Sequence, residues 1–189
     1  MSQMSSYQRT DMLRAPQKST HTSNHRPAKA AMPWQMPAYT RRMGVDAYLK
    51  QVHNATPMQI IEIERAGVAG TFITDLSSRM DLPSSRVFTM LRIPKATAAR
   101  KMAEGSVIDG RAGQAAVGMV KLLGMAQDIV NDSTAKQAKD FDSVKWLGLW
   151  IEQPQASLGG LKPADLLDTP TGIEMVARVL GSIQSGAYQ

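Results

Sequence analysis

The chain has 189 residues, a formal net charge of +6 and no cysteine. Its length is enough for one or two small domains with a real hydrophobic core. Without thiols, the chain cannot build a disulfide framework, a cysteine-ligated zinc site or a cysteine nucleophile. The longest apolar run, Val117–Met125, is interrupted by Lys121 and is much shorter than the roughly 20 residues that span a membrane.

The polar N-terminus and the few histidines exclude further classes of protein. The first residues lack the apolar stretch and the small-residue cleavage site of a secretory signal, so we expect a cytoplasmic protein. The three histidines, His21, His25 and His53, all precede the main apolar segments, and the sequence contains no glycine-rich phosphate loop of the Walker type. We therefore expect no enzyme activity, no catalytic residue, no metal site and no cofactor.

Basic charge is concentrated at the front of the chain. The net charge is +6 over residues 1–50, +2 over 51–130 and −2 over 131–189. This asymmetry indicates two different kinds of partner. A basic tail that only keeps the protein soluble is the alternative.

Residues 1–45 have the composition of a mobile extension. They contain four prolines and almost no aliphatic clusters, so they cannot bury enough surface to offset the entropy of ordering them. Their lysines and arginines could contact a phosphate backbone. Trp34 and Tyr39 either dock onto the following domain or are an incidental part of the tail.

Helical periodicity begins at Thr56, because Thr56-Pro57 is a typical N-cap and first-turn pair and Gly67 ends the segment. No segment shows strand alternation, so the predicted fold class is all-α. Further helices are expected over 71–80, over 85–91 with Ser84 or Ser85 as the cap, over 95–104, 112–130 and 146–151, as one turn over 163–167, and from Thr169-Pro170 to Gly186.

The segment Ser85–Lys101 has the rhythm of a helix-turn-helix, with a short helix, a three-residue turn and a second amphipathic helix. Arg92 stands where a glycine is usual in the turn. The residues expected to face inward are Val87, Met90, Leu91, Ile93, Ala98 and Met102.

Polar residues on the outer face of the second helix are candidates for contacts with DNA. Lysine and arginine can neutralise phosphates or donate to guanine, and threonine can bond a phosphate or touch a thymine methyl group. An ordinary solvated helix face is the alternative. The predicted DNA-binding residues are Lys95, Thr97, Arg100 and Lys101, with a second possibility at Ser84, Ser85 and Arg86.

The helix over 112–130 carries an apolar stripe from Ala115 to Ile129 at steps of four, three, four and three residues. Such a stripe can pair two chains, and a palindromic operator would mirror a two-fold dimer. A monomer could equally bury the stripe in its own core. We expect a homodimer.

The C-terminal segment contains the most specific pattern, a Trp-Leu helix, a Pro-x-x-x-Leu-Gly-Gly turn, a Pro-x-x-Leu-Leu-x-Thr-x-x-Gly stretch and a Val-x-x-x-Leu helix. This pattern resembles the C-terminal domain of the ParS/MbcA/Xre antitoxin family. The positions that carry the resemblance are Trp146, Leu147, Pro154, Leu158, Gly159, Gly160, Pro163, Leu166, Leu167, Thr169, Gly172, Val176, Leu180 and Gly186.

The resemblance implies an antitoxin of a type II toxin–antitoxin pair whose partner is a RES-domain, NAD⁺-consuming toxin. It implies an Xre-like helix-turn-helix domain over 46–130 that binds operator DNA as a dimeric repressor, and a toxin-binding domain over 131–189, while the basic extension over 1–45 lies outside the match. Inhibition would be steric, with the end of the antitoxin reaching toward the toxin's active-site cleft. The segment Leu91–Arg100 matches the family's Xre-like part less closely.

Large side chains and the terminal segment are the predicted toxin contacts, whereas Trp146 is expected in the domain's own core. Two other readings stay open, a stand-alone transcription regulator whose C-terminal domain serves dimerisation or sensing, and a structural or polar-localising partner protein. The predicted toxin-binding residues are Trp150, Leu158, Gly159, Gly160, Ser185, Gly186, Ala187, Tyr188 and Gln189.

Overall fold

The computed structural model describes residues 36–102, 105–133 and 140–184, and these residues confirm the predicted all-α class. The only strands among them are two residues long and form one antiparallel pair, Val68 with Ile108 and Ala69 with Val107. In order, the elements are α1 (Val45–His53), α2 (Pro57–Ala66), β1 (Val68–Ala69), α3 (Gly70–Arg79), α4 (Ser84–Met90), α5 (Lys95–Lys101), β2 (Val107–Ile108), α6 (Gly110–Asn131), α7 (Ser143–Trp150), η2 (Ala156–Leu158), η3 (Pro163–Asp165) and α8 (Pro170–Gln184).

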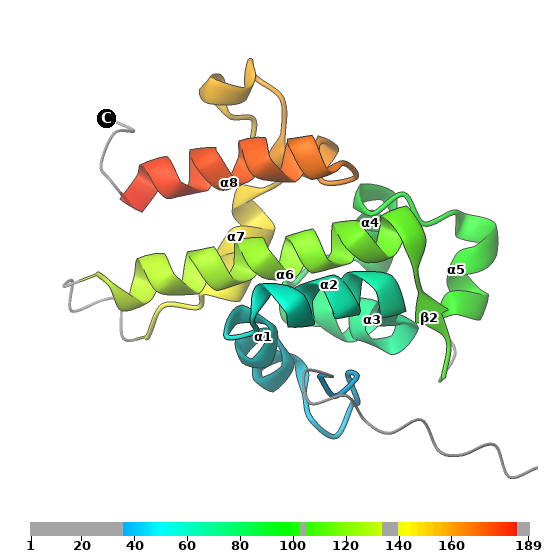
Figure 1. Ribbon diagram of the computed structural model, residues 1–189. Helices are drawn as coiled ribbons and strands as arrows, with labels where there is room; N and C mark the ends of the chain where they lie inside the picture. The colour runs from blue at the N-terminus through cyan, green and yellow to red at the C-terminus, as the bar shows by residue number, and fades with distance from the viewer. Residues whose placement is uncertain (1–35, 103–104, 134–139, 185–189) are drawn as a thin grey trace, which may run out of the picture. The chain divides into compact units, whose positions relative to one another are not determined.

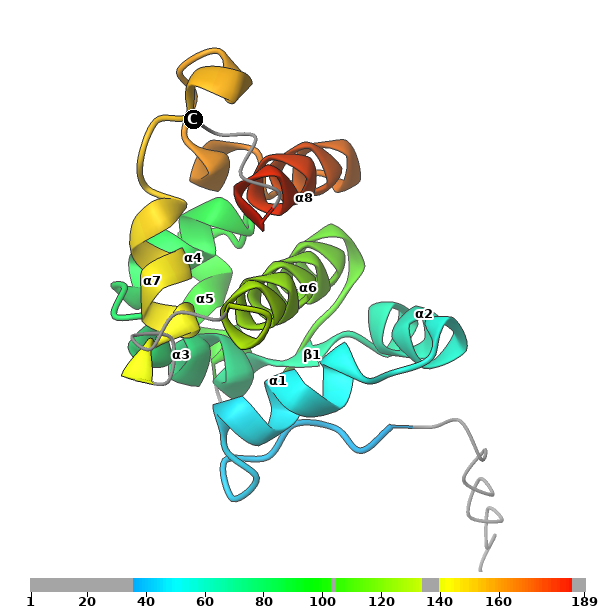
Figure 2. The same cartoon turned by 90° about the vertical axis from the view of Figure 1, so that its left-hand side faces the viewer.

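Helix α6 is the centre of the fold, and α1, α2, α7 and α8 all pack against it (Figure 1). Figure 2 looks nearly along α6 and shows the other helices around it. Glycines allow two of these helices to approach closely. A Cβ at Gly118 would overlap the side chain of Ile173 on α8, and a Cβ at Gly124 would overlap the ring of His53 on α1.

The predicted apolar stripe of α6 lies inside this core. Ala115, Met119, Leu122 and Ala126 are buried, and Ile129 is partly buried against them. The chain therefore covers the stripe with its own helices, which was the alternative to a dimer interface. A homodimer, if it forms, uses another surface.

Local sequence signals explain where α2 begins and ends. The Thr56 hydroxyl accepts a hydrogen bond from the Gln59 amide, and the Gln59 side chain accepts one from the Thr56 amide, which is a capping box. Pro57 follows at the first helical position, and Gly67 ends the helix at φ +81°. The predicted serine cap of α4 is wrong, because Ser84 lies in the first turn and Pro83 is the N-cap. The Ser84 hydroxyl instead shares a hydrogen bond with that of Ser77.

The segment just before α1 corrects the predicted boundary of the extension. Of residues 1–45, those from 36 onward are described, and Tyr39 is only 5% exposed. Its ring packs edge-on against Tyr48 and Phe72, and its hydroxyl donates a 2.7 Å hydrogen bond to Asp75. Burial and this hydrogen bond raise the pKa of Tyr39. Tyr39 therefore docks onto the domain, whereas Trp34 lies outside the described residues.

Within the described ranges, none of the helices combines the length and apolar character needed to cross a bilayer.

Candidate functional site

The segment Ser85–Lys101, which was predicted to be a helix-turn-helix, has the predicted inward residues. Val87, Met90 and Leu91 of the first half are buried, as are Ile93 in the turn and Ala98 on α5. Met102 is partly buried against the same core. The sequence pattern therefore predicts this part of the fold correctly.

Arg92 takes the position in the turn where glycine is usual, and its φ of +54° lies in the left-handed region. Its Nε atom donates to Asp168, 3.1 Å away, in the loop before α8. This ion pair connects the turn to the C-terminal part of the chain.

The predicted DNA-binding residues differ in solvent exposure and in whether they already bind another part of the chain. Lys95 and Arg100 are exposed on α5, and Ser85 is exposed on α4. The Lys101 ammonium donates to the carbonyl of Val107 and lies 3.4 Å from Asp109, so it is tied to β2. The side chain of Thr97 is not among those described.

Arg86 is held against the C-terminal part of the chain. Its Nε and Nη2 atoms lie 2.5 and 3.0 Å from the two carboxylate oxygens of Glu152, and Nη2 lies 3.5 Å from Asp165. The hydrogen bonds from Arg86 lower the pKa of Glu152 despite its partial burial. The predicted contact of Arg86 with DNA stays a prediction, and it would compete with this pair.

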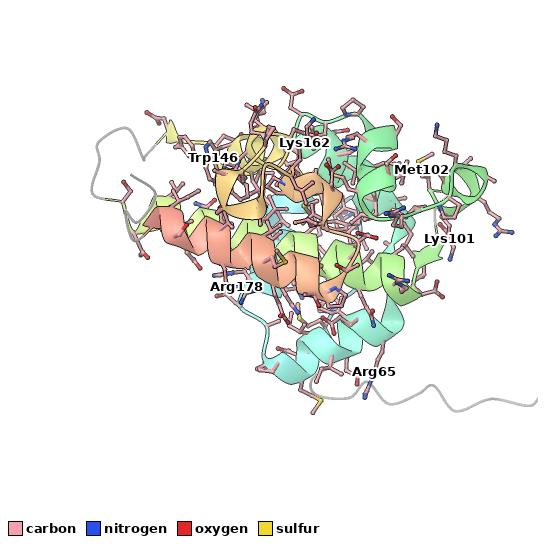
Figure 3. The ribbon with its side chains drawn as sticks, turned by 90° about the horizontal axis from the view of Figure 1, so that it is seen from above. Arg65, Lys101, Met102, Trp146, Lys162 and Arg178 are labelled. Carbon is pink, nitrogen blue, oxygen red and sulfur yellow. The ribbon has the colours of Figure 1, made fainter. Side chains whose placement is uncertain are left out.

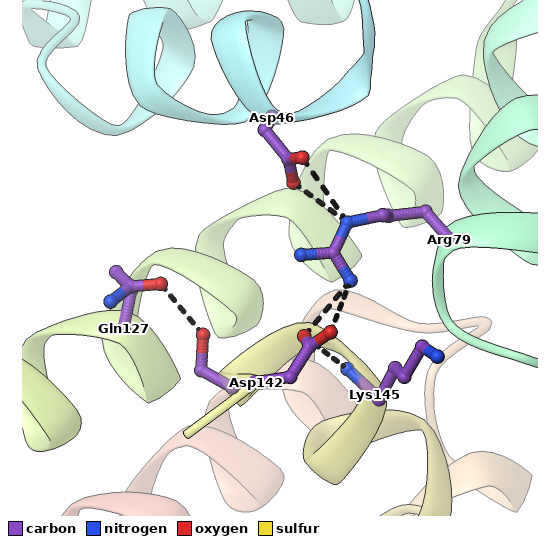
Figure 4. A network of polar contacts seen from close by, with 6 residues as sticks. Asp46, Arg79, Gln127, Asp142 and Lys145 are labelled. Atoms are coloured by element: carbon purple, nitrogen blue, oxygen red, sulfur yellow. Dashed lines mark hydrogen bonds and ion pairs between the residues drawn. The ribbon is translucent and has the colours of Figure 1, made fainter. Parts of the chain in front are cut away.

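A second arginine, Arg79 at the end of α3, joins three parts of the chain (Figure 4). Its Nε atom donates to Asp46 on α1, and its Nη1 atom donates to both oxygens of Asp142. Asp142 is also the N-cap of α7 and accepts from the Lys145 amide. Burial raises the pKa of Asp142, but these hydrogen bonds outweigh it and lower the pKa overall.

We call Arg79, Arg86 and Arg92, with the carboxylates that they bind, the arginine pairs. They lie far apart in sequence from their partners in the acidic last third of the chain, by 63 residues for Arg79 and Asp142 and by 66 for Arg86 and Glu152. From the sequence, the charge asymmetry was attributed to external partners, and these ion pairs within the chain were not predicted. The only signal was the −2 net charge of residues 131–189 beside a basic front.

The predicted toxin-binding residues divide into surface and core. Gly159 and Gly160 are exposed and have φ values of +66° and +82°, and the Gly160 amide donates to the Gln155 carbonyl to close the turn. Leu158 is 6% exposed and belongs to the core, so it supports the turn and presents little surface to a partner. Ser185–Gln189 lie outside the described residues.

Both tryptophans of α7 are partly buried. Trp146 and Trp150 stack with ring centroids 5.9 Å apart and an interplanar angle of 22°, and both pack against the core. Both tryptophans therefore contribute to the core, as expected for Trp146, and the toxin contact of Trp150 stays a prediction.

No group of three or more histidine or acidic side chains that could hold a metal ion occurs in residues 36–102, 105–133 and 140–184.

Known proteins resemble this chain in two ways. Residues 138–186 match the family model described as the antitoxin Xre/MbcA/ParS C-terminal toxin-binding domain. A protein of Sphingobium sp. (strain YBL2), named Prs ADP-ribosylating antitoxin, is 32% identical over 139 residues, which are 74% of this chain and 86% of that protein. No solved structure matches the chain. The second likeness extends well beyond residues 138–186, into the helical part upstream.

Proposed function

Because this chain belongs to the Xre/MbcA/ParS antitoxin family, we propose that it binds its cognate toxin through the C-terminal domain and blocks the toxin's active site sterically. The single observation that carries the proposal is the match of residues 138–186 to a toxin-binding domain. Inhibition of this kind needs no chemistry from the antitoxin, only a rigid surface of suitable shape.

The candidate contacts within this domain are Trp150, the exposed Gly159-Gly160 turn and the terminal segment Ser185–Gln189. The turn lies between η2 and η3, where its two glycines leave the backbone open to an approaching partner. The terminal segment follows directly after α8.

The toxin that we propose is a RES-domain protein that consumes NAD⁺. Two observations support an NAD⁺-consuming partner. The sequence pattern of the C-terminal segment resembles antitoxins of such toxins, and the name of the Sphingobium relative refers to ADP-ribosylation. ADP-ribosyl transfer also uses NAD⁺, so the two possibilities share a substrate and differ in the acceptor.

We further propose that the chain binds its own operator as a dimer. Lys95, Thr97, Arg100 and Lys101 on α5 are the candidate contacts, with Ser85 and Arg86 on α4 as the second possibility. The observation in favour is the helix-turn-helix packing, with exposed Lys95 and Arg100 on its second helix. A stand-alone transcription regulator is the alternative function.

Co-expression with the product of the neighbouring reading frame tests the proposal. We expect a complex in a tag pull-down, restored growth, and NAD⁺ levels that fall only when the toxin is expressed alone. A chain that lacks Gly186–Gln189 should still bind but should restore growth less well. No complex and no rescue, together with intact DNA binding, would favour the stand-alone regulator. Stable NAD⁺ in cells that the toxin kills would contradict the proposed toxin chemistry.

A further inference from the structure

Several exposed apolar groups of the C-terminal domain gather on one side of α7, while Leu161 and Met175 are exposed elsewhere in the domain. The buried residues of this helix include Val144, Leu147 and Gly148, while Leu149 is 64% exposed. Trp146 is three residues before Leu149, and Trp150 directly follows it. With 3.6 residues per turn, Leu149 points away from the buried Val144, Leu147 and Gly148, and the partly buried Trp146 and Trp150 lie between Leu149 and the buried side.

Phe141, just before α7, extends this side. It is 44% exposed, and its ring centroid lies 6.1 Å from that of Trp146. We call Phe141, Trp146, Leu149 and Trp150 the aromatic face. Contiguous exposed apolar groups of this kind mark interaction sites, and tryptophan is among the residues that contribute most to binding energy.

Helix α7 is fixed at both ends, so the aromatic face is held in one orientation. Asp142 at its start binds Arg79, and Glu152 just after its end binds Arg86. On the buried side, a Cβ at Gly148 would overlap the carbonyl of Met80, so α7 lies directly on the α3 end. A surface that is already ordered loses less conformational entropy when it binds.

We propose that the aromatic face is the main docking surface for the cognate toxin. This inference rests on the proposed function, since the face lies within residues 138–186, which match a toxin-binding domain. The toxin surface that fits is apolar, with an acidic group at its edge opposite Lys145, which is exposed one turn before Leu149. Figure 3 shows Trp146 well apart from Lys101 on α5, one of the candidate DNA contacts.

The test compares two exposed apolar residues in the full chain. Leu149→Asp places a charge on the aromatic face, and Met58→Asp is the matched control on α2, where Met58 is 53% exposed and lies outside the toxin-binding domain. With the toxin from the neighbouring reading frame as the ligand, Leu149→Asp should weaken binding about tenfold or more. Met58→Asp should bind as the original chain does. Circular dichroism checks that both variants are folded.

A photo-crosslinking residue at position 149 or at position 58 gives a second readout that does not depend on stability. Crosslinking to the toxin from position 149 alone supports the proposal. Crosslinking from position 149 to a second copy of the antitoxin overturns it, as does a Leu149→Asp variant that binds within twofold of the original chain. If the original chain forms no complex with the toxin, the proposed function fails together with the docking surface. If the complex forms and Leu149→Asp leaves it intact, only the docking surface fails.

Discussion

Helices α5 and α7 are nearly equal in length, with seven and eight residues, but they are held in different ways. Helix α7 has a side-chain cap from Asp142, four buried residues and an arginine pair at each end. Helix α5 has Pro94 as its N-cap, with no side-chain hydrogen bond to the helix, and among its described side chains only Ala98 is buried.

Isolated helices of this length are marginal in water, so each depends on its surroundings. Helix α7 obtains a fixed orientation from both ends and from its buried side, which suits a surface that must match a rigid partner. Helix α5 packs against α4, and Lys101 at its C-terminal end contacts β2. Its exposed lysine and arginine are suited to binding phosphates, where attraction between opposite charges matters more than a precise fit of shape. These differences agree with the two proposed roles, in which α7 binds the toxin and α5 binds DNA.

The substitution Gly148→Ala is expected to have the largest effect on the packing of α7. The new methyl group would overlap the Met80 carbonyl, which cannot move away as a flexible side chain can, so we expect a loss of about 3 kcal/mol in the free energy of unfolding. Gly181→Ala on α8 is the matched control, because nothing lies near a Cβ there, and it should raise stability by up to about 1 kcal/mol. Urea unfolding measures both. Equal stabilities of the two variants would show that α7 does not rest on α3 as described.

Arg86→Ala removes one fixed end of α7 and has the next largest expected effect. It leaves the half-buried Glu152 without its main partner, and we expect a loss of about 2 kcal/mol at neutral pH. Arg65→Ala is the control, because Arg65 forms an exposed pair with Glu62 on a single helix, and it should change stability by no more than about 0.5 kcal/mol.

The stability of the Arg86→Ala variant should also depend on pH in a different way from that of the original chain. Because Arg86 lowers the pKa of Glu152 in the folded state, the pair contributes its full stability above the ordinary glutamate pKa of about 4.3 and loses it as the pH falls toward the lower folded value. Arg86→Ala should therefore differ most from the original chain above that pH, and the difference should shrink in acid. Thermal unfolding across this range checks it. A constant difference would show that the charge of Glu152 is not involved.

On the α5 side, the double variant Lys95→Ala with Arg100→Ala should lower operator affinity about tenfold, or about 1.4 kcal/mol, with little effect on folding because both side chains are exposed. If each cation contacts one phosphate, the slope of log affinity against log salt should fall by about 2. Fluorescence anisotropy at several salt concentrations measures both quantities. Unchanged toxin binding is the control, and a double variant with undiminished DNA affinity would move the contact to Ser85 and Arg86.

Local chemistry made much of the fold predictable. The Thr56-Pro57 start of α2, the inward residues of the helix-turn-helix and the Thr169-Pro170 start of α8 all follow from caps and periodicity. Helix α1 was not predicted, because helical periodicity was recognised only from Thr56 onward, although residues 46–55 were placed in the helical domain. The β1–β2 pair was not predicted either, because two residues are too few to show alternation.

The candidate site was less predictable because it depends on contacts between distant parts of the chain. The arginine pairs that reach the C-terminal part of the chain join residues more than 60 positions apart, and no local pattern indicates which carboxylate an arginine will bind. Leu149 was also missed. In sequence, the α7 segment is apolar nearly all round, and only packing decides that Leu147 faces inward while Leu149 faces solvent.

Helix α6 connects the helical domain and the C-terminal domain physically, because helices of both pack against it. The glycines that admit α1 and α8 are on this one helix, which also ends at the predicted boundary between the DNA-binding and toxin-binding domains. The C-terminal domain therefore shares its hydrophobic core with α6, against which α7 and α8 both pack. A recombination event that gave this chain a new toxin specificity would have to bring α6 with it, or preserve the face of α6 on which α8 lies.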